Sequence, residues 1–197
     1  MKRVASIVLF VLIPMFADSV NGWEPLHEAV YEADMNRTRG IVENSDADID
    51  AQSKAGIAPL HIAVKIRNLP MVDYLLEHGA DVDIQDNNGY TPLLYAIGQH
   101  RLKIVKTLLQ HDADVNLANS QGITPLQQAA YSNDFPIVDY LLDHGADPEI
   151  LNANGINACE LAYIKGNFSM AHHLLAYTKG VCGKYVDELN ATKGSRE

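Results

Sequence analysis

The chain has 197 residues, 47% hydrophobic and 20% charged, an ordinary composition that excludes collagen-like, low-complexity and strongly disordered proteins. Its 25 acidic residues outnumber its 15 basic residues, which gives a formal charge of −10. No Lys or Arg cluster lies beyond the extreme N-terminus, so the sequence predicts neither nucleic acid nor anionic lipid as a partner.

The first 22 residues have the features of a cleaved export signal. A basic start at Lys2 and Arg3 precedes an uncharged, mostly apolar run at residues 4–16. A transmembrane helix needs roughly 20 such residues, although an uncleaved membrane anchor is the alternative. Small residues offer several cleavage sites between positions 17 and 22. We therefore predict a mature protein without a membrane anchor, located in a Gram-negative periplasm or secreted.

The remaining sequence repeats a unit of 33 residues. The motif Gly-Tyr-Thr-Pro-Leu at 89–93 recurs as Gly-Ile-Ala-Pro-Leu at 56–60 and as Gly-Ile-Thr-Pro-Leu at 122–126. A closing motif, Leu-Leu followed by an acid or amide and His, recurs with the same period. The first copy is separated from the second by 34 residues, which indicates one residue inserted between Val42 and Asp46.

These motifs resemble ankyrin repeats. The resemblance implies an all-α ankyrin solenoid of five repeats, each a helix–turn–helix with a projecting β-turn, the terminal two degenerate. We expect a repeat domain at 23–179, then a C-terminal cap and tail at 180–197. The repeats are expected at about 19–52, 53–85, 86–118, 119–151 and 152–179.

Local sequence signals support helices at these places. Thr91 and Thr124 are good N-cap residues, and each precedes a proline that fits the first helical turn. Gly79 and Gly145 follow the second helices, where a left-handed residue commonly ends a helix. Asp112 replaces this glycine in the third repeat and should cost some backbone strain.

The sequence contains no catalytic signature, so we predict a protein that is not an enzyme and uses no cofactor or metal. Cys159, His172, His173 and Cys182 are residue types that bind zinc. However, His172 and His173 are adjacent on a helix and point about 100° apart. A Cys159–Cys182 disulfide suits an oxidising compartment, and Cys159 as a small buried hydrophobe is the further alternative.

Histidines and aspartates also recur at the repeat period, at His78, His111 and His144 and at Asp48, Asp81, Asp114 and Asp147. Stacked repeats are about 8–10 Å apart, too far for shared metal ligation. We expect a solvated histidine row, with a pH-sensitive stripe as the alternative, and prefer a structural role for the aspartates to calcium binding. For His27 and His61 the resemblance implies hydrogen bonds to the backbone of the next repeat.

Ankyrin repeats usually bind partners through the β-turn tips and the adjoining face of the first helices. The resemblance therefore places binding at the variable positions of that face. They are Trp23, Tyr31, Glu32, Lys54, Ala55, Ile57, Lys65, Ile66, Asn87, Asn88, Tyr90, Gly98, Gln99, Ser120, Gln121, Ile123, Tyr131 and Ser132.

Among these positions we predict partner-binding residues at Trp23, Lys54, Ile57, Asn87, Asn88, Tyr90, Gln99, Gln121, Ile123, Tyr131 and Ser132. The aromatic and apolar members are typical interface anchors, because such residues dominate binding energies. An alternative role for Trp23 is to cover the open end of the first repeat.

The sequence as a whole predicts a monomeric, non-enzymatic module that binds a protein outside the cytoplasm. The excess of acid favours a basic partner. The biological role stays open between an immunity or inhibitor protein against a toxin, an accessory factor that protects an envelope enzyme, and a secreted effector that engages host proteins.

Overall fold

The computed structural model describes residues 22–178 and residue 182. Within this part the chain forms ten α-helices and no strand, which confirms the predicted all-α repeat solenoid. The predicted signal peptide and the predicted C-terminal cap and tail lie outside the described residues, apart from Gly22 and Cys182. None of the described helices is long and apolar enough to cross a membrane.

The helices form five consecutive pairs, one for each predicted repeat. The first helices of the pairs are α1 (Pro25–Tyr31), α3 (Pro59–Lys65), α5 (Pro92–Gly98), α7 (Pro125–Tyr131) and α9 (Ala158–Ile164). The second helices are α2 (Met35–Asn44), α4 (Leu69–Glu77), α6 (Leu102–Gln110), α8 (Phe135–Asp143) and α10 (Phe168–Leu175). α2 has ten residues where α4, α6 and α8 have nine, so it absorbs the residue inserted in the first repeat.

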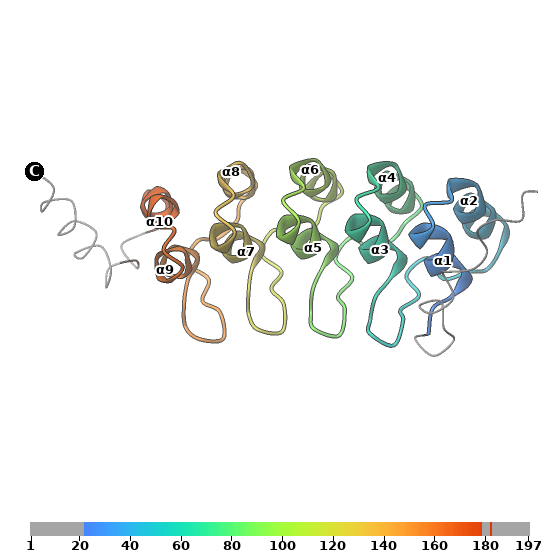
Figure 1. Cartoon of the computed structure of the whole chain (residues 1–197), viewed down its shortest axis with the longest axis horizontal. Coiled ribbons are helices and arrows are strands. Elements are labelled where there is room, and N and C mark those ends of the chain that lie inside the picture. Colours follow the sequence, from blue (N-terminus) through green and yellow to red (C-terminus); the bar gives the residue numbers. More distant parts are fainter. Residues whose placement is uncertain (1–21, 179–181, 183–197) are drawn as a thin grey trace, which may run out of the picture.

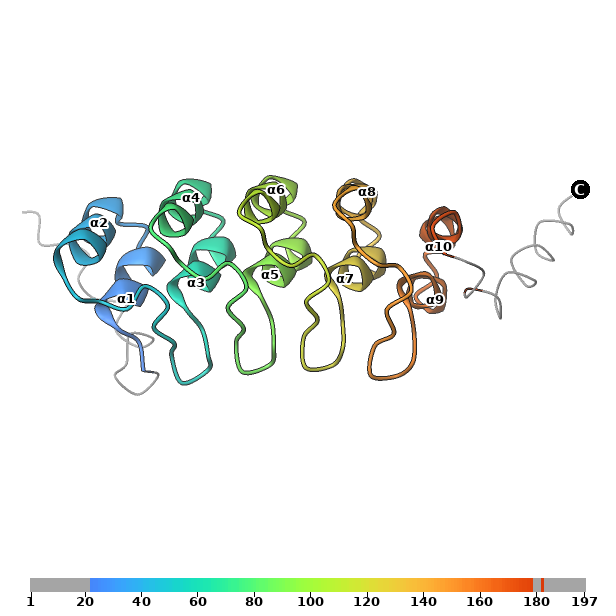
Figure 2. The same ribbon diagram turned by 180° about the vertical axis from the view of Figure 1, so that it is seen from behind.

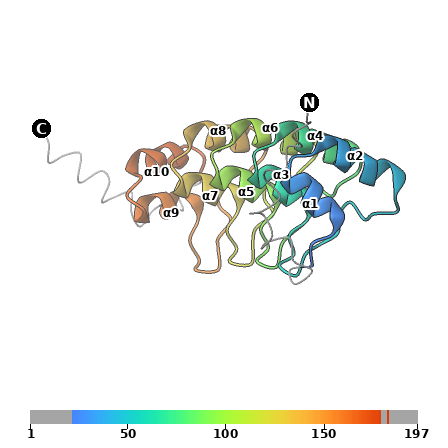
Figure 3. The same ribbon diagram turned by 45° about the vertical axis from the view of Figure 1, so that its right-hand side comes forward.

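The pairs stand side by side in one row, with the first helices in one layer and the second helices in another (Figure 1). The same order is visible from behind (Figure 2). Long turns project from the first-helix layer, away from the second helices, as the rotated view shows (Figure 3). The fold therefore presents a turn side and a second-helix side.

A column of buried leucines joins the first helices. Leu26, Leu60, Leu93 and Leu126 occupy the same repeat position, and each is at most 1% exposed. Cys159 occupies this position in the fifth repeat and is also buried. Because neighbouring first helices contact one another directly, each leucine helps to bury the next repeat.

Side-chain caps begin the helices where the sequence predicts them. The Thr91 Oγ1 atom accepts the Leu94 N–H at 3.2 Å, and Thr124 caps α7 in the same way. Ala58 has no side-chain cap for α3, but His61, in the third helical position, accepts the Ala58 N–H through its Nδ1 atom at 3.1 Å.

His61 also links two repeats, as the family resemblance implies. Its Nε2–H donates to the Tyr90 carbonyl oxygen at 2.9 Å, and His27 donates to the Ile57 carbonyl oxygen at 3.0 Å. Burial lowers the pKa of His61, which keeps the imidazole neutral and able to use one nitrogen as donor and the other as acceptor. These histidines are therefore engaged in structure.

The chain reverses between paired helices through residues with positive φ. Four of these reversals use a residue other than glycine, at Ala33, Arg67, His100 and Asn133. Asp112 also has a positive φ of 64°, as the sequence predicts for a residue in the helix-ending glycine position.

The projecting turns are tied to one another. In each turn a buried polar side chain accepts two backbone N–H groups; the Asp86 carboxylate, for example, accepts those of Asn88 and Tyr90 at 2.8 and 2.9 Å. Backbone hydrogen bonds then join neighbouring tips, as in the Ser120 N–H to Asn88 carbonyl bond of 3.0 Å. The tips therefore form a continuous, ordered edge.

Candidate partner-binding surface

The turns and the first helices together form one side of the solenoid. We call this surface the turn face; it comprises the tips at residues 53–57, 86–90, 119–123 and 152–156 and the exposed sides of α1, α3, α5, α7 and α9. Every predicted partner-binding residue belongs to these segments or lies within two residues of them, but the structure does not bring them all together.

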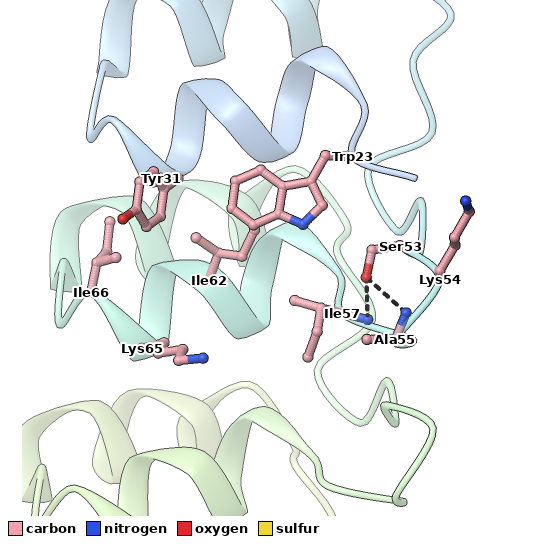
Figure 4. A pocket seen from close by; sticks show the side chains of 9 residues that line it. All are labelled: Trp23, Tyr31, Ser53, Lys54, Ala55, Ile57, Ile62, Lys65 and Ile66. Carbon is pink, nitrogen blue, oxygen red and sulfur yellow. Dashed lines mark hydrogen bonds between the residues drawn. The ribbon is translucent and has the colours of Figure 1, made fainter. Parts of the chain in front are cut away.

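A hollow of about 640 Å³ opens on the turn face between the first two repeats. Its wall is mostly aromatic or aliphatic, with two lysines at its rim (Figure 4). The lining residues are Trp23, Tyr31, Ser53, Lys54, Ala55, Ile57, Ile62, Lys65 and Ile66. Three predicted binding residues, Trp23, Lys54 and Ile57, therefore share one site.

Trp23 and Tyr31 form the wall on the side of the first repeat. Their rings meet edge to face, with centroids 5.5 Å apart, and Tyr31 is 47% exposed. Trp23 also stacks on His27, so it packs on the first repeat and lines the hollow at the same time.

One position in the wall of the hollow carries isoleucine where the third repeat carries the larger side chain of tyrosine. Tyr95, the third repeat's equivalent of Ile62, packs on Tyr90 with ring centroids 5.7 Å apart. Its hydroxyl donates to the Asp86 carboxylate at 2.9 Å. Burial is the main cause of the raised pKa of Tyr95, and this hydrogen bond is the second. Ile62 and Ser53 stand at the corresponding positions of the second repeat and leave the space open.

Sequence reasoning did not select Ser53 and Ile62 as site residues. Ser53 holds the turn, because its Oγ atom accepts the N–H groups of Ala55 and Ile57 at 3.3 and 3.1 Å (Figure 4). Ile62 is 3% exposed and reads as a core residue in the repeat pattern. Comparing Ile62 with Tyr95 along the repeat is the signal that could have found this site.

Two predicted residues of the third repeat, Asn87 and Gln99, form side-chain hydrogen bonds to the second repeat. Asn87 donates through Nδ2 to the Lys54 carbonyl oxygen at 2.8 Å, and Gln99 accepts from Arg67 Nε at 2.8 Å. Tyr90 is half-buried against Tyr95, so it is less accessible than a free surface anchor.

The fourth repeat provides a second aromatic position, away from the hollow. Tyr131 is 42% exposed, and Lys165 covers its ring while donating to its hydroxyl at 2.6 Å. Asn88 and Gln121 are exposed at the tips, whereas Ile123 and Ser132 are half-buried. The predicted aromatic and apolar anchors are thus divided between the hollow and the Tyr131 position.

The charges of the turn face differ from those of the whole chain. Arg37 forms ion pairs with both Glu28 and Glu32 at 2.9 Å, which offsets one of their two negative charges. Among the described residues, neither Lys54 nor Lys65 has an acidic partner within ion-pair distance. The rim of the hollow therefore carries two lysines without an ion-pair partner among the described residues, on a protein that is acidic overall.

The cysteines and histidines considered for zinc are otherwise engaged. A disulfide joins Cys159 to Cys182, with Cα atoms 6.1 Å apart, so neither sulfur is a free thiolate. His173 pairs with Asp139 at 2.6 Å, and His172 is exposed. Across residues 22–178 and 182, no group of three or more potential metal ligands is present.

The recurrent histidines and aspartates bond within their own segments. The Nδ1 atoms of His78 and His144 form hydrogen bonds with the carbonyl oxygens of Tyr74 and Tyr140, at 2.8 and 2.7 Å. The aspartates each accept the backbone N–H two residues further on, at Asp48, Asp81, Asp114 and Asp147.

A further carboxylate joins the same loops across repeats. Asp83 accepts the Asp114 N–H of the next repeat at 3.0 Å, and in the following loop Asn116 accepts the Asp147 N–H at 2.8 Å. Burial raises the pKa of Asp83 above its ordinary value; the bond from Asp114 N–H opposes the shift, and the charges of Asp114 and Asp81 add to it.

Asp83→Asn should stabilise the protein at neutral pH by a few tenths of a kcal/mol, a small effect because exposed charges are screened. The raised pKa means that the ionised carboxylate is disfavoured in the folded state, so stability is lost as the pH rises through the folded pKa. Asparagine keeps the acceptor oxygen, as Asn116 demonstrates. Urea unfolding at several pH values should show the gain at pH 7 and its disappearance below the ordinary aspartate pKa; a gain that persists in acid would contradict this explanation.

Five stacked helical pairs with linked projecting turns define a repeat solenoid. Two family models described as ankyrin repeats match the chain, one over residues 26–119 and the other over residues 108–162. The chain belongs to the ankyrin repeat family, whose members are protein–protein interaction modules and are generally not enzymes. Comparison with curated proteins gave no match.

Proposed function

We propose that this protein binds a partner protein through the turn face and does so outside the cytoplasm. The observation that carries the proposal is the apolar hollow between α1 and α3, lined by Trp23, Tyr31 and Ile57. At the same junction one repeat further along, Tyr95 packs against Tyr90 and against His61 of the preceding repeat, so the repeat fold does not require an open apolar site there. Exposed aromatic residues beside a hollow are the usual anchors of protein interfaces.

The second-helix side offers a poorer binding surface. On α4, α6 and α8 the exposed positions other than Pro70 and Pro136 are charged or amide side chains, namely Glu77, Lys103, Lys106, Gln110, Asp139 and Asp143, whereas Phe168 at the start of α10 is 53% exposed. Such a mixed polar surface is typical of the solvated face of a helix. The turn face is therefore the better candidate.

The extracytoplasmic location rests on two independent features. The N-terminal sequence has a basic start, a short apolar run and small residues after it. The Cys159–Cys182 disulfide adds support, because disulfides persist mainly in oxidising compartments. N-terminal sequencing of the protein isolated from its native envelope should find a start between positions 18 and 23; intact Met1 on cytoplasmic protein would refute export.

Three roles fit such a module: neutralising a toxin, protecting an envelope enzyme, or engaging a host protein. The net charge of −10 favours a partner that is basic overall, because long-range attraction raises the association rate. We expect a soluble monomer that acts without a cofactor. Purification of the tagged protein from its own compartment, followed by mass spectrometry, identifies the partner and distinguishes these roles.

Once the partner is known, Tyr131→Ala should weaken binding by about 2 kcal/mol if Tyr131 is a true anchor. The side chain is 42% exposed and contacts Lys165, so its loss should change stability little. Titration calorimetry measures the affinity, and Gln110→Ala, an exposed position on α6, is the matched control. Normal binding by Tyr131→Ala and lost binding by Gln110→Ala would move the interface to the second-helix side. Tyr90→Ala is a second test, but its packing on Tyr95 requires a parallel stability measurement.

A further inference from the structure

We infer that the hollow between α1 and α3 binds an acidic peptide segment that carries one large aliphatic side chain. This inference deepens the proposed function and rests on it, because it names the chemistry of the partner segment at one part of the turn face. The apolar side chain would enter the hollow, and carboxylates on either side of it would face the lysines at the rim.

The apolar half of the inference follows from the lining. Trp23, Ile57, Ile62 and Ile66 present aromatic and aliphatic atoms to a space of about 640 Å³, ample room for one large side chain of a partner. Figure 4 shows Trp23 and Tyr31 on the first-repeat side, above the isoleucines of the second repeat. Burying an aliphatic side chain there would remove apolar surface from water on both partners.

The acidic half follows from the two lysines. Lys54 projects from the turn and Lys65 from α3, and both line the hollow (Figure 4). The equivalent positions of the third repeat are Asn87 and Gly98, so the repeat pattern does not require a cation at either place. Among the described residues no carboxylate pairs with these ammonium groups.

The negative charge of the whole protein does not oppose this assignment at close range. Exposed charges separated by more than about 8 Å are largely screened at physiological ionic strength, so the potential at the hollow depends on the two lysines that line it and on Glu28 and Glu32 of the first repeat, which share the single cation Arg37. A partner that is basic overall can still present a short acidic segment at this contact. Binding of that segment should weaken as salt is added.

Trp23 is the chain's single tryptophan, so its fluorescence reports directly on the hollow. The probes are three short peptides without aromatic residues: a leucine flanked by glutamates, the same leucine flanked by lysines, and an alanine flanked by glutamates. The first should shift Trp23 fluorescence of the purified protein saturably. The other two should bind about tenfold more weakly or worse, since each lacks one of the two interactions.

Protein variants test separately how the lysine charges and the open volume of the hollow contribute to peptide binding. Lys54→Gln and Lys65→Gln should each weaken binding of the leucine–glutamate peptide by about threefold, as expected for a solvent-exposed charge pair. Lys103→Gln, on the second-helix side, should leave binding unchanged. Ile62→Tyr combined with Ser53→Asp copies the third repeat's own pair, Tyr95 and Asp86, and should fill the hollow and abolish the fluorescence response.

Equal binding of the lysine-flanked and glutamate-flanked leucine peptides, or no response to either, would overturn the inference. Retained binding by the filled variant with an unchanged melting temperature would also overturn it. If none of the peptides binds while Tyr131→Ala still weakens partner binding, the proposal that the turn face binds the partner stands and the inferred peptide site is wrong. If partner binding ignores every turn-face substitution, both proposals fall.

Discussion

Leu93→Ala should lower the free energy of unfolding by about 2–5 kcal/mol, the range for removing a fully buried leucine side chain. Leu93 lies in α5 at the centre of the row and is 0% exposed. Its cavity would weaken contacts with the repeats on both sides, because α5 packs against both α3 and α7. In a solenoid the stability of each repeat depends on those neighbouring interfaces, so the loss should reach the whole cooperative unit.

Urea unfolding followed by far-ultraviolet circular dichroism measures this change. Lys103→Ala is the control, because Lys103 is exposed on the neighbouring helix α6 and should shift stability by no more than about 0.5 kcal/mol. Leu126→Ala should behave like Leu93→Ala, since Leu126 is equally buried one repeat further along. A Leu93→Ala effect as small as that of the control would show that the leucine column does not hold the repeats together.

The recurrent motifs and their resemblance to ankyrin repeats were sufficient to predict the fold. Thr91 and Thr124 mark helix starts through the chemistry of a hydroxyl acceptor, and Asp112 marks a helix end despite having a side chain. These are local effects, which depend on residues close in sequence and recur at the same repeat position. The period therefore gave the number of repeats, and the resemblance to ankyrin repeats implied how their helices are arranged.

The hollow could not be predicted in the same way. It depends on how far Tyr95 reaches toward Asp86 in one repeat and how much space Ile62 leaves in another. Repeat position identified Trp23, Lys54 and Ile57 as accessible, but it gave no information on which of them share a space. Cooperation between residues of neighbouring repeats appears only when the side chains are placed.

The cysteines show a related limit. Sequence composition left zinc, a disulfide and a buried thiol as alternatives for Cys159 and Cys182, which are 23 residues apart. The choice depends on where the chain goes after α10, and no periodic signal exists there. The disulfide ties Cys182 to α9, at the position where the other repeats have a buried leucine.

Gly89→Ala should destabilise the protein by about 2–5 kcal/mol, because two independent costs coincide at this turn. Gly89 has a φ of 75°, in the left-handed region that a Cβ atom disfavours, for which the cost is about 1–2 kcal/mol. A Cβ atom there would also lie 2.6 Å from the backbone nitrogen of Ser120 in the next repeat. The backbone cannot move aside as a side chain can, so the turns would separate, with a further cost of about 1–3 kcal/mol.

Gly79→Ala separates the two costs. Gly79 also has a positive φ, of 88°, but a Cβ atom added there would meet nothing within 4 Å. Asp112 occupies the equivalent place in the third repeat with a φ of 64°, which shows that a side chain is accommodated there. Gly79→Ala should therefore cost about 1–2 kcal/mol from conformation alone. If urea unfolding gives the same loss of stability for both variants, the close approach between turns contributes nothing to stability. We expect the larger loss at Gly89, because the hydrogen bond from the Ser120 N–H to the Asn88 carbonyl oxygen holds the two tips together.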